Sequence, residues 1–303
     1  MLQRLEFRAM GCEMLALVER ESASALLAKV PEWFEEWEQV LSRFRYDSEL
    51  TRLNQIHERP VGVSEILWDV LRAARLAERM TDGLVTPTLL DAIVDAGYDR
   101  PFGLLPHQTQ YVTDPVLAAP PPLTAMAVNS LRRTVTLPYG MSLDFGGIAK
   151  GWAAHQAVKR LKAEGPALVN AGGDIAISGP RADGGPWQIG VTNPFNRREE
   201  LETLFLKACG VATSGKDRRR WTRNEILQHH IIDPATSQPA ETDLLTVTVV
   251  APDVMQAEAA AKAAFILGSR VGLEWIDVRP GLAAVFILDN GQVLYSHKME
   301  KFL

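Results

Sequence analysis

Several short segments of the chain carry residues suited to binding phosphate groups. In LDFGGIAKGWA, residues 143–153, a predicted strand ends at Asp144, two glycines follow, and Lys150 opens a predicted helix. Glycines let a ligand approach the backbone, and a helix N-terminus offers free N–H groups and a positive dipole to an anion. The spacing is not that of a Walker A loop. Taken alone, the segment fits a phosphate site and an ordinary tight turn with a solvated lysine equally well.

Hydroxyl groups and positive charges follow one another in VATSGKDRRRW, residues 211–221. Thr213 and Ser214 supply the hydroxyls, and the cations come after a flexible glycine. This combination is suited to a diphosphate, although a run of charges is more often a solvated turn. The Gly-Gly-Asp of NAGGDIAISG, residues 170–179, favours a plain turn over a ligand site.

The candidate general base is His230, in HHIIDP, residues 229–234. Histidine titrates near neutral pH, which suits it to removing a proton from a hydroxyl group. His230 is predicted at a strand end before a turn, where a structural and a catalytic role are equally consistent with the pattern. In a predicted helix over 257–268, Glu258 and Lys262 have the i, i+4 spacing of a helix ion pair.

Both strands and helices are predicted to position these residues. Alternating or continuous apolar residues predict strands over 13–19, 187–194 and 245–252. Hairpins are predicted over 125–137 and 283–296, the second with an Asn-Gly turn. Helices are predicted over 22–45 (interrupted by Pro31), 64–80, 150–164 and 257–268. Strands and helices mix without a regular βαβ rhythm, so the sequence predicts the α+β class.

The composition sets limits on the class of protein. The chain has 303 residues with 47% hydrophobic and 23% charged side chains, values near those of an average globular protein. Its net charge of -5 argues against nucleic acid as a partner. The only two cysteines, Cys12 and Cys209, exclude a disulfide framework and fit a reducing compartment. No signal peptide or run of about 20 apolar residues is present, so we expect a cytoplasmic protein without a membrane anchor.

Taken in order, these segments resemble the FAD:protein FMN transferases, the ApbE family. The resemblance begins with FRAMGC at 7–12, LSRFRYDSELTRLN at 41–54 and DGLVTPT at 82–88, and continues through LDFGGIAKG, LVNAGGD, ATSG, HHIIDP and AEAAAKAAFILG. Each motif is weak by itself, but eight in the expected order are specific. The resemblance implies one ApbE-like domain over 1–303, α+β in class, with two interleaved lobes of mixed sheet and helices and an FAD cleft between them. A proline-rich loop is predicted around 98–122.

The family resemblance also implies an activity. Such an enzyme is magnesium-dependent, breaks the diphosphate of FAD, releases AMP, and links FMN through its phosphate to a Thr or Ser of a target flavoprotein. The alternative is an FAD-binding protein or FAD pyrophosphatase that has lost protein flavinylation. Many members are exported lipoproteins, whereas we expect this chain to be cytoplasmic.

Site residues carry over from the family motif by motif. The resemblance implies that His230 is the base that activates the acceptor hydroxyl. It implies FAD-binding positions at Met10, Phe44, Val85, Thr86, Pro87, Asp144, Lys150 and Ile232, and the ATSG motif adds Thr213 and Ser214. The expected metal ligands are Glu258 and the backbone carbonyls of Gly147 and Ala261.

The last motif departs from the family pattern. Glu258 and Lys262 stand where an Asp and a metal-binding Thr are usual, and a protonated lysine cannot bind a metal ion. Lys262 therefore has three interpretations: its ammonium replaces the metal, it is a surface partner of Glu258, or the lost ligand disables catalysis. Lys216 and His155 also stand where acids are common. The hypothesis that side-chain charge replaces metal charge predicts turnover in a strong chelator.

Overall fold

The computed structural model describes residues 1–106, 108–109 and 119–303, and the chain forms two compact units. Residues 107 and 110–118, within the predicted proline-rich loop, lie outside the described residues. Unit 1 comprises Met1–Glu35, Lys150–Asp217 and Thr242–Leu303, and unit 2 comprises Glu36–Ala149 and Arg218–Glu241. Both units contain helices and strands, in agreement with the predicted α+β class.

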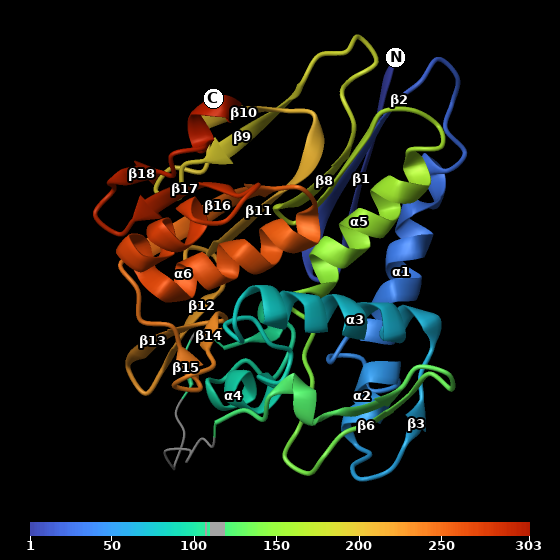
Figure 1. Cartoon of the computed structure of the whole chain (residues 1–303), viewed down its shortest axis with the longest axis vertical. Coiled ribbons are helices and arrows are strands. Elements are labelled where there is room, and N and C mark those ends of the chain that lie inside the picture. The colour runs from blue at the N-terminus through green and yellow to red at the C-terminus, as the bar shows by residue number, and fades with distance from the viewer. Residues whose placement is uncertain (107, 110–118) are drawn as a thin grey trace. The chain divides into compact units, whose positions relative to one another are not determined.

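Unit 1 is built around one antiparallel sheet of eight strands in the order β1-β2-β7-β8-β11-β16-β17-β18 (Figure 1). The strands are β1 (Leu2–Ala9), β2 (Cys12–Glu19), β7 (Ala167–Ala171), β8 (Asp174–Ser178), β11 (Ala208–Gly215), β16 (Leu244–Ala251), β17 (Ala283–Leu288) and β18 (Val293–Tyr295). Every residue of β17 is buried, which explains why its sequence is apolar throughout and does not alternate.

One face of this sheet is covered by α5 (Ala149–Leu161) and α6 (Val254–Asp277) (Figure 1). Asp253 caps α6, since its side chain accepts a hydrogen bond from the N–H of Gln256 at 3.0 Å. The sequence predicts the end of this helix at Gly268. The structure has a kink there, with a φ of 77° at the glycine, and the helix then continues to its end at Asp277.

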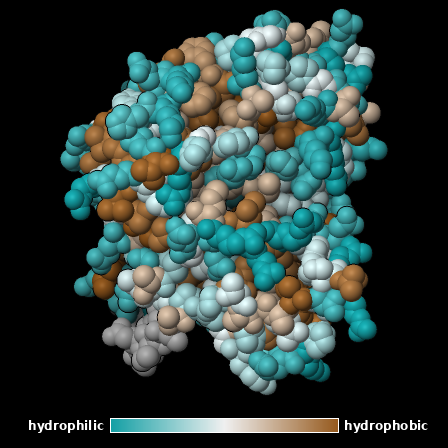
Figure 2. Space-filling model, in the orientation of Figure 1, coloured by the Kyte–Doolittle hydropathy of each residue, from teal (hydrophilic) through white to brown (hydrophobic). Residues whose placement is uncertain are grey.

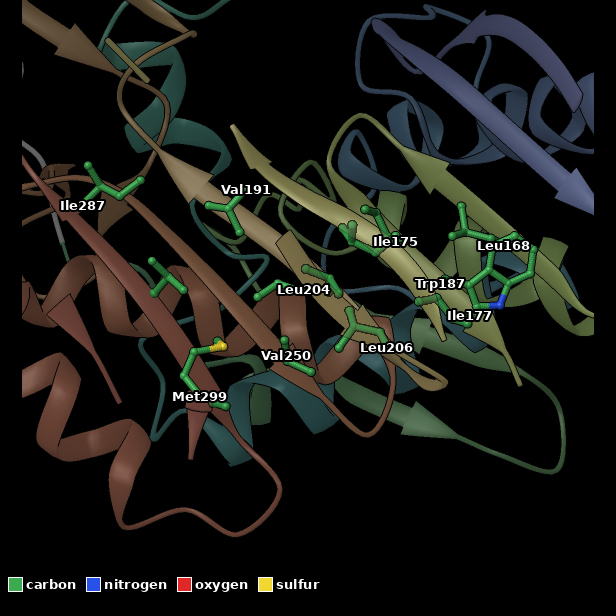
Figure 3. Close-up of a cluster of buried hydrophobic side chains, with 14 residues drawn as sticks. Leu168, Ile175, Ile177, Trp187, Val191, Leu204, Leu206, Val250, Ile287 and Met299 are labelled. Carbon is green, nitrogen blue, oxygen red and sulfur yellow. The ribbon is translucent and has the colours of Figure 1, made fainter. Parts of the chain in front are cut away.

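The opposite face of the sheet is covered by a two-stranded ribbon of β9 (Trp187–Thr192) and β10 (Glu200–Leu206). Apolar side chains from both layers form one buried cluster (Figure 3). Its members include Leu168, Ile175, Ile177, Trp187, Val191, Leu204, Leu206, Val250, Ile287 and Met299. The sheet therefore has both faces packed, and residues at its strand ends are the ones left to meet a ligand.

Helix α1 (Val30–Leu41) accounts for the aromatic stripe of the sequence. Pro31 lies in its first turn, where a proline costs no hydrogen bond, so the helix begins there and does not kink. Trp37 is 1% exposed, in agreement with a core role for the stripe. The helix ends at Leu41, so Phe44, predicted as part of the stripe, lies beyond the helix and is 38% exposed.

Unit 2 contains three further helices, α2 (Glu49–Asn54), α3 (Glu65–Met80) and α4 (Leu90–Asp95). Its strands are β3 (Val61–Gly62), β4 (Gln108–Thr109), β5 (Ala127–Asn129), β6 (Thr134–Thr136), β12 (Arg220–Arg223), β13 (Ile226–His229), β14 (Ile232–Asp233) and β15 (Gln238–Pro239). They form three small sheets, β3-β6-β5, β13-β12-β4 and β14-β15. Ser64 caps α3 as predicted, by accepting from the N–H of Leu67 at 3.2 Å.

Hydrophilic side chains separate the apolar residues into small groups on the face drawn in Figure 2. Large exposed hydrophobic residues, among them Leu131, Tyr46 and Val278, come from both units. Scattered exposure of this kind is usual for a globular protein. Within the described residues, no helix has the length and hydropathy needed to cross a bilayer.

Candidate active site

Two tight hairpin turns pack against each other in unit 1. Met10 and Gly11 form the turn from β1 to β2, with φ angles of 48° and 69°. Gly172 and Gly173 form the turn from β7 to β8, with φ angles of 65° and 104°. A Cβ at Gly172 would lie 2.7 Å from the Cβ of Cys12, so only glycine fits. With its φ of 48°, Met10 has a left-handed backbone. This conformation costs a residue with a side chain about 1–2 kcal/mol and is common at ligand sites.

Four charged side chains form a cluster where α5, α6 and β8 meet. The ammonium of Lys150 donates to Asp174 and, at 3.2 Å, to Oε1 of Glu258. The ammonium of Lys262 donates to the same Oε1 at 3.1 Å, and the N–H of Gly151 donates to Oε2 at 3.0 Å. The two carboxylate side chains are 3% and 2% exposed, against 15% and 16% for the lysines. The carboxylates are thus more deeply buried than the side chains of the two lysines.

The electrostatics of this cluster keep its carboxyl groups charged at neutral pH. Burial and the nearby Glu258 raise the pKa of Asp174 to about 6. Burial acts in the same direction on Glu258, but Lys150 and Lys262 outweigh it and lower the pKa of Glu258 to about 2. Although burial alone would lower the pKa of Lys150, the two carboxylates raise it above its usual value. Two negative and two positive groups therefore balance at pH 7.

Gly151 lets α5 approach α6. A Cβ at this position would lie 2.6 Å from Oε2 of Glu258 and 3.2 Å from the carbonyl oxygen of Val254. Gly151 is the last glycine of LDFGGIAKG, and its lack of a side chain makes room for the neighbouring helix. This close packing of the helices lets the ammonium of Lys150 reach Oε1 of Glu258.

The two hydroxyls of the ATSG motif lie on opposite faces of β11. Gly210 faces α6, because a Cβ there would lie 2.0 Å from the backbone nitrogen of Val254. Side chains alternate along a strand, so Ser214 shares this face and Thr213 does not. The hydroxyl of Thr213 instead makes a 2.9 Å hydrogen bond to that of Thr248 on β16. Of the two predicted contacts, only Ser214 is on the side of the sheet that carries the charged cluster.

Lys216, the first cation after this motif, has other partners than the sequence suggests. Lys216 donates to the carbonyl oxygen of Thr242 at 2.7 Å and to Oδ2 of Asp289 at 2.8 Å. Its ammonium therefore joins the end of β11 to the loops beside β16 and β17. This is a structural role, and Lys216 does not belong to the charged cluster.

In unit 2, the glycine-turn motif meets the segment of Val85, Thr86 and Pro87. The N–H of Asp144 donates to the carbonyl oxygen of Pro87 at 2.8 Å, which fixes the two motifs side by side. Val85 is buried, and its own N–H donates to the hydroxyl of Thr81 at 3.0 Å. The resemblance had implied a backbone contact to FAD from this segment, and the structure shows it tightly held.

Arg43 is a candidate site residue that the sequence reasoning missed. Its Nε lies 3.4 Å from Oδ1 of Asp144, and its Nη2 donates to the carbonyl oxygen of Tyr98 at 2.7 Å. Its guanidinium carbon lies 4.0 Å from the ring centre of Phe44, and that ring lies 5.7 Å from the ring of Tyr98. The signal was its place in LSRFRYDS directly before Phe44, but an arginine beside an aromatic residue is common and says little alone.

A pocket of about 510 Å³ in unit 2 is lined by residues of two motifs, DGLVTPT and HHIIDP. Its lining is Glu78, Arg79, Asp82, Gly83, Thr86, Thr88, Ala119, Pro120, Pro121, Pro122, Thr124 and Pro234. The hydroxyl of Thr86 donates to Oε1 of Glu78 at 2.9 Å, so its position in the pocket wall is fixed. Motifs far apart in the sequence are thereby brought together.

The paired histidines of HHIIDP differ in their surroundings. His229, the last residue of β13, is buried; its Nδ1 accepts from the N–H of Ile231 at 3.3 Å, so its Nε2 donates to the carbonyl oxygen of Ala240 at 3.1 Å. His230 lies in the bend after β13 and is partly exposed. Both ring nitrogens of His229 make hydrogen bonds to the backbone, so His230 is the better candidate base. Ile232 packs into the core beside Trp221, so only its backbone can meet a ligand.

The residues expected to hold a metal ion do not fit magnesium in unit 1. Mg²⁺ requires oxygen ligands at about 2.0–2.1 Å in near-octahedral geometry. At Glu258, the oxygen that would bind it already accepts from two ammonium groups, and Ala261 is fully buried within α6. Gly147, the third expected ligand, lies in the turn before α5. Nowhere among the described residues do three or more His, Cys, Asp or Glu side chains form a group that could hold a metal ion.

Comparison with known proteins shows the family to which the chain belongs. The model of the ApbE family matches residues 10–286. An FAD:protein FMN transferase of Treponema pallidum is 31% identical over 299 residues, covering 93% of this chain and 83% of that protein. One of Salmonella typhimurium is 27% identical over 289 residues, covering 91% of this chain and 80% of that protein. The chain therefore belongs to the ApbE family.

Solved structures agree on the fold. The ApbE protein of Thermotoga maritima is 24% identical to this chain, with a TM-score of 0.89. The superposition covers 100% of this chain and 99% of the Thermotoga chain. The flavin transferase ApbE of Vibrio cholerae is also 24% identical, with a TM-score of 0.82 over 100% of this chain and 99% of its own. At this identity the likeness concerns the fold, and it confirms the predicted α+β architecture of the family.

Proposed function

We propose that this protein is an FAD:protein FMN transferase. The match of residues 10–286 to the ApbE family carries the proposal. It is supported by two relatives that align with more than nine tenths of this chain and are named FAD:protein FMN transferase. The hydroxyl oxygen of a Thr or Ser in a target flavoprotein attacks the phosphorus of the FMN half of FAD. The bond from that phosphorus to the bridging oxygen breaks, AMP leaves, and the target keeps FMN through a phosphoester.

In this proposal, the charged cluster of unit 1 holds the diphosphate. The side chains of Lys150 and Lys262 are more exposed than the carboxylates of the cluster, and Ser214 lies on the same face of the sheet. Positive groups fixed beside a diphosphate stabilise the charge that develops on the leaving phosphate. Because the buried carboxylates hold the ammonium groups in place, little reorganisation is needed as the bond breaks.

His230 takes the proton of the acceptor hydroxyl in this proposal. Its exposure and its place in a bend between short strands suit a group that must reach an incoming side chain. Phe44 and the segment of Val85, Thr86 and Pro87 are proposed to bind the flavin nucleotide, as the resemblance implies. Cys12 and Cys209 are both free thiols, in keeping with a cytoplasmic setting for the reaction.

The deciding experiment incubates the protein with FAD and a target flavoprotein domain, then measures the intact mass of the target and the AMP released. We expect the target to gain one FMN minus water, with one AMP released for each adduct. His230→Ala should abolish the adduct while the protein still binds FAD. AMP release without an adduct would identify an FAD pyrophosphatase, and bound FAD without AMP would identify a binding protein. Either result would contradict the proposal.

A further inference from the structure

Both oxygens of the Glu258 carboxylate accept hydrogen bonds from nitrogen donors. Oε1 accepts from Lys150 at 3.2 Å and from Lys262 at 3.1 Å, and Oε2 accepts from the N–H of Gly151 at 3.0 Å. The side chain is 2% exposed, so water does not compete for these bonds. A divalent cation on Oε1 would have to displace both ammonium groups or lie against them.

The balance of charges in the cluster also argues against a bound divalent cation. Two lysines and two carboxylates make the cluster neutral, and a magnesium ion added to it in the absence of a ligand would leave two uncompensated positive charges in a largely buried place. In the absence of a ligand, such a neutral cluster needs no further cation. Its two lysine side chains are 15% and 16% exposed and supply the positive charge of the cluster, while the carboxylates, at 3% and 2% exposure, hold the ammonium groups in place.

Lys262 also has hydrogen-bonding capacity to spare. Its ammonium has a single acceptor among the described residues, Oε1 of Glu258. An ammonium group carries three N–H donors, so two remain for phosphate oxygens. The side chain projects from α6 one helical turn after Glu258, which fixes the direction from which it meets a ligand.

We propose that the ammonium of Lys262, held by Glu258 and aided by Lys150, takes the place of a divalent cation, so that this enzyme transfers FMN without a metal. The inference rests on the proposed function. The reaction keeps the same balance: the acceptor oxygen bonds to phosphorus, the phosphorus–oxygen bond to AMP breaks, and the hydroxyl proton goes to His230. Lys262 only donates N–H groups to the diphosphate and its leaving phosphate.

The test begins with a direct measurement of metal binding. The purified protein, stripped of metal, is titrated with Mn²⁺ in the presence of FAD and followed by electron paramagnetic resonance. We expect no stoichiometric binding to the wild type. One tightly bound Mn²⁺ per chain would overturn the inference, whether or not the protein is active.

Transfer of FMN to the target flavoprotein is then measured in excess EDTA and in excess Mg²⁺. We expect equal rates in both. A rate that falls at least about tenfold in EDTA and returns with Mg²⁺ would reject the inference and leave the proposed function intact. An absence of transfer in both conditions would instead reject the proposed function, and the Mn²⁺ titration would still decide whether a metal binds.

Variants separate charge from fold. Lys262→Met should lower the rate at least about tenfold in both conditions, since no cation remains at the diphosphate. Lys262→Thr returns the usual residue, so Mg²⁺ should rescue it and Mn²⁺ should now bind. Lys159→Met, an exposed lysine on α5, is the matched control and should behave as wild type. Equal rates for Lys262→Met and the control would contradict the proposal.

Discussion

Nε of Arg43 lies 3.4 Å from Oδ1 of Asp144, in a pair whose side chains are 7% and 17% exposed. The same guanidinium lies over the ring of Phe44. We therefore expect Arg43→Met to weaken FAD binding about tenfold, and Arg43→Lys to restore only part of it, because lysine lacks the planar group that stacks on a ring. Flavin fluorescence titration measures the Kd. Arg72→Met, an exposed change on α3, is the control; a Kd unchanged by Arg43→Met would remove Arg43 from the site.

The two adjacent histidines should respond differently to substitution. His229→Ala removes the partner of both Ile231 N–H and the carbonyl oxygen of Ala240, so we expect a loss of about 1–3 kcal/mol in the free energy of unfolding. His230→Ala should leave that free energy nearly unchanged and stop FMN transfer. Urea unfolding and the mass assay measure the two effects. Equal losses of stability in both variants would mean that His230 is structural as well.

Gly151 should tolerate no side chain. Gly151→Ala places a Cβ 2.6 Å from Oε2 of Glu258, so α5 and α6 must separate and the charged cluster must open. We expect a lower Tm together with weaker FAD binding. Gly179→Ala is a suitable control, since a Cβ there meets nothing within 4 Å. A Tm as high as that of the control would show that the helices can shift at no cost.

Glu19 should make the fold sensitive to acid. Burial acts to raise its pKa, but the N–H of Ala182 and the guanidinium of Arg181 lower it below the ordinary value of 4.5. A lowered carboxyl pKa adds stability that is fully present above the ordinary value and is lost as the pH falls through the folded one. Glu19→Gln should therefore destabilise the protein at neutral pH and have less effect in acid. Urea midpoints at several pH values test this; a constant difference between the two proteins would contradict it.

Periodicity in the sequence located most helices and strands but not all of their ends. The Asn-Gly hairpin, the Ser64 cap and the helix after Lys150 were predicted correctly. The strand β1 was missed because its residues alternate only between exposed and half-buried and include charges. The end of α6 was placed at Gly268, since a glycine usually stops a helix, but tertiary packing resumes the helix after the kink.

The site shows a similar division. Lys150, Glu258 and Lys262 were named from the sequence, but their contact with Asp174 depends on helix and strand packing that no local pattern reports. Thr213 and Ser214 were grouped because they are adjacent, and adjacency in a strand places them on opposite faces. Arg43 gave only a weak signal, because its importance comes from its contact with Asp144, about a hundred residues away in the chain.

The interleaving of the two units has a consequence for synthesis on the ribosome. Unit 1 contains Lys150–Asp217 and Thr242–Leu303, with part of unit 2 between them. Within its sheet, β11 pairs with β16, which follows that intervening segment. All residues of unit 2 are thus made before β16 and α6, and β11 waits with one edge unpaired in the growing chain. An open strand edge invites pairing with other chains, so the nascent protein is exposed to misassembly until its own β16 arrives.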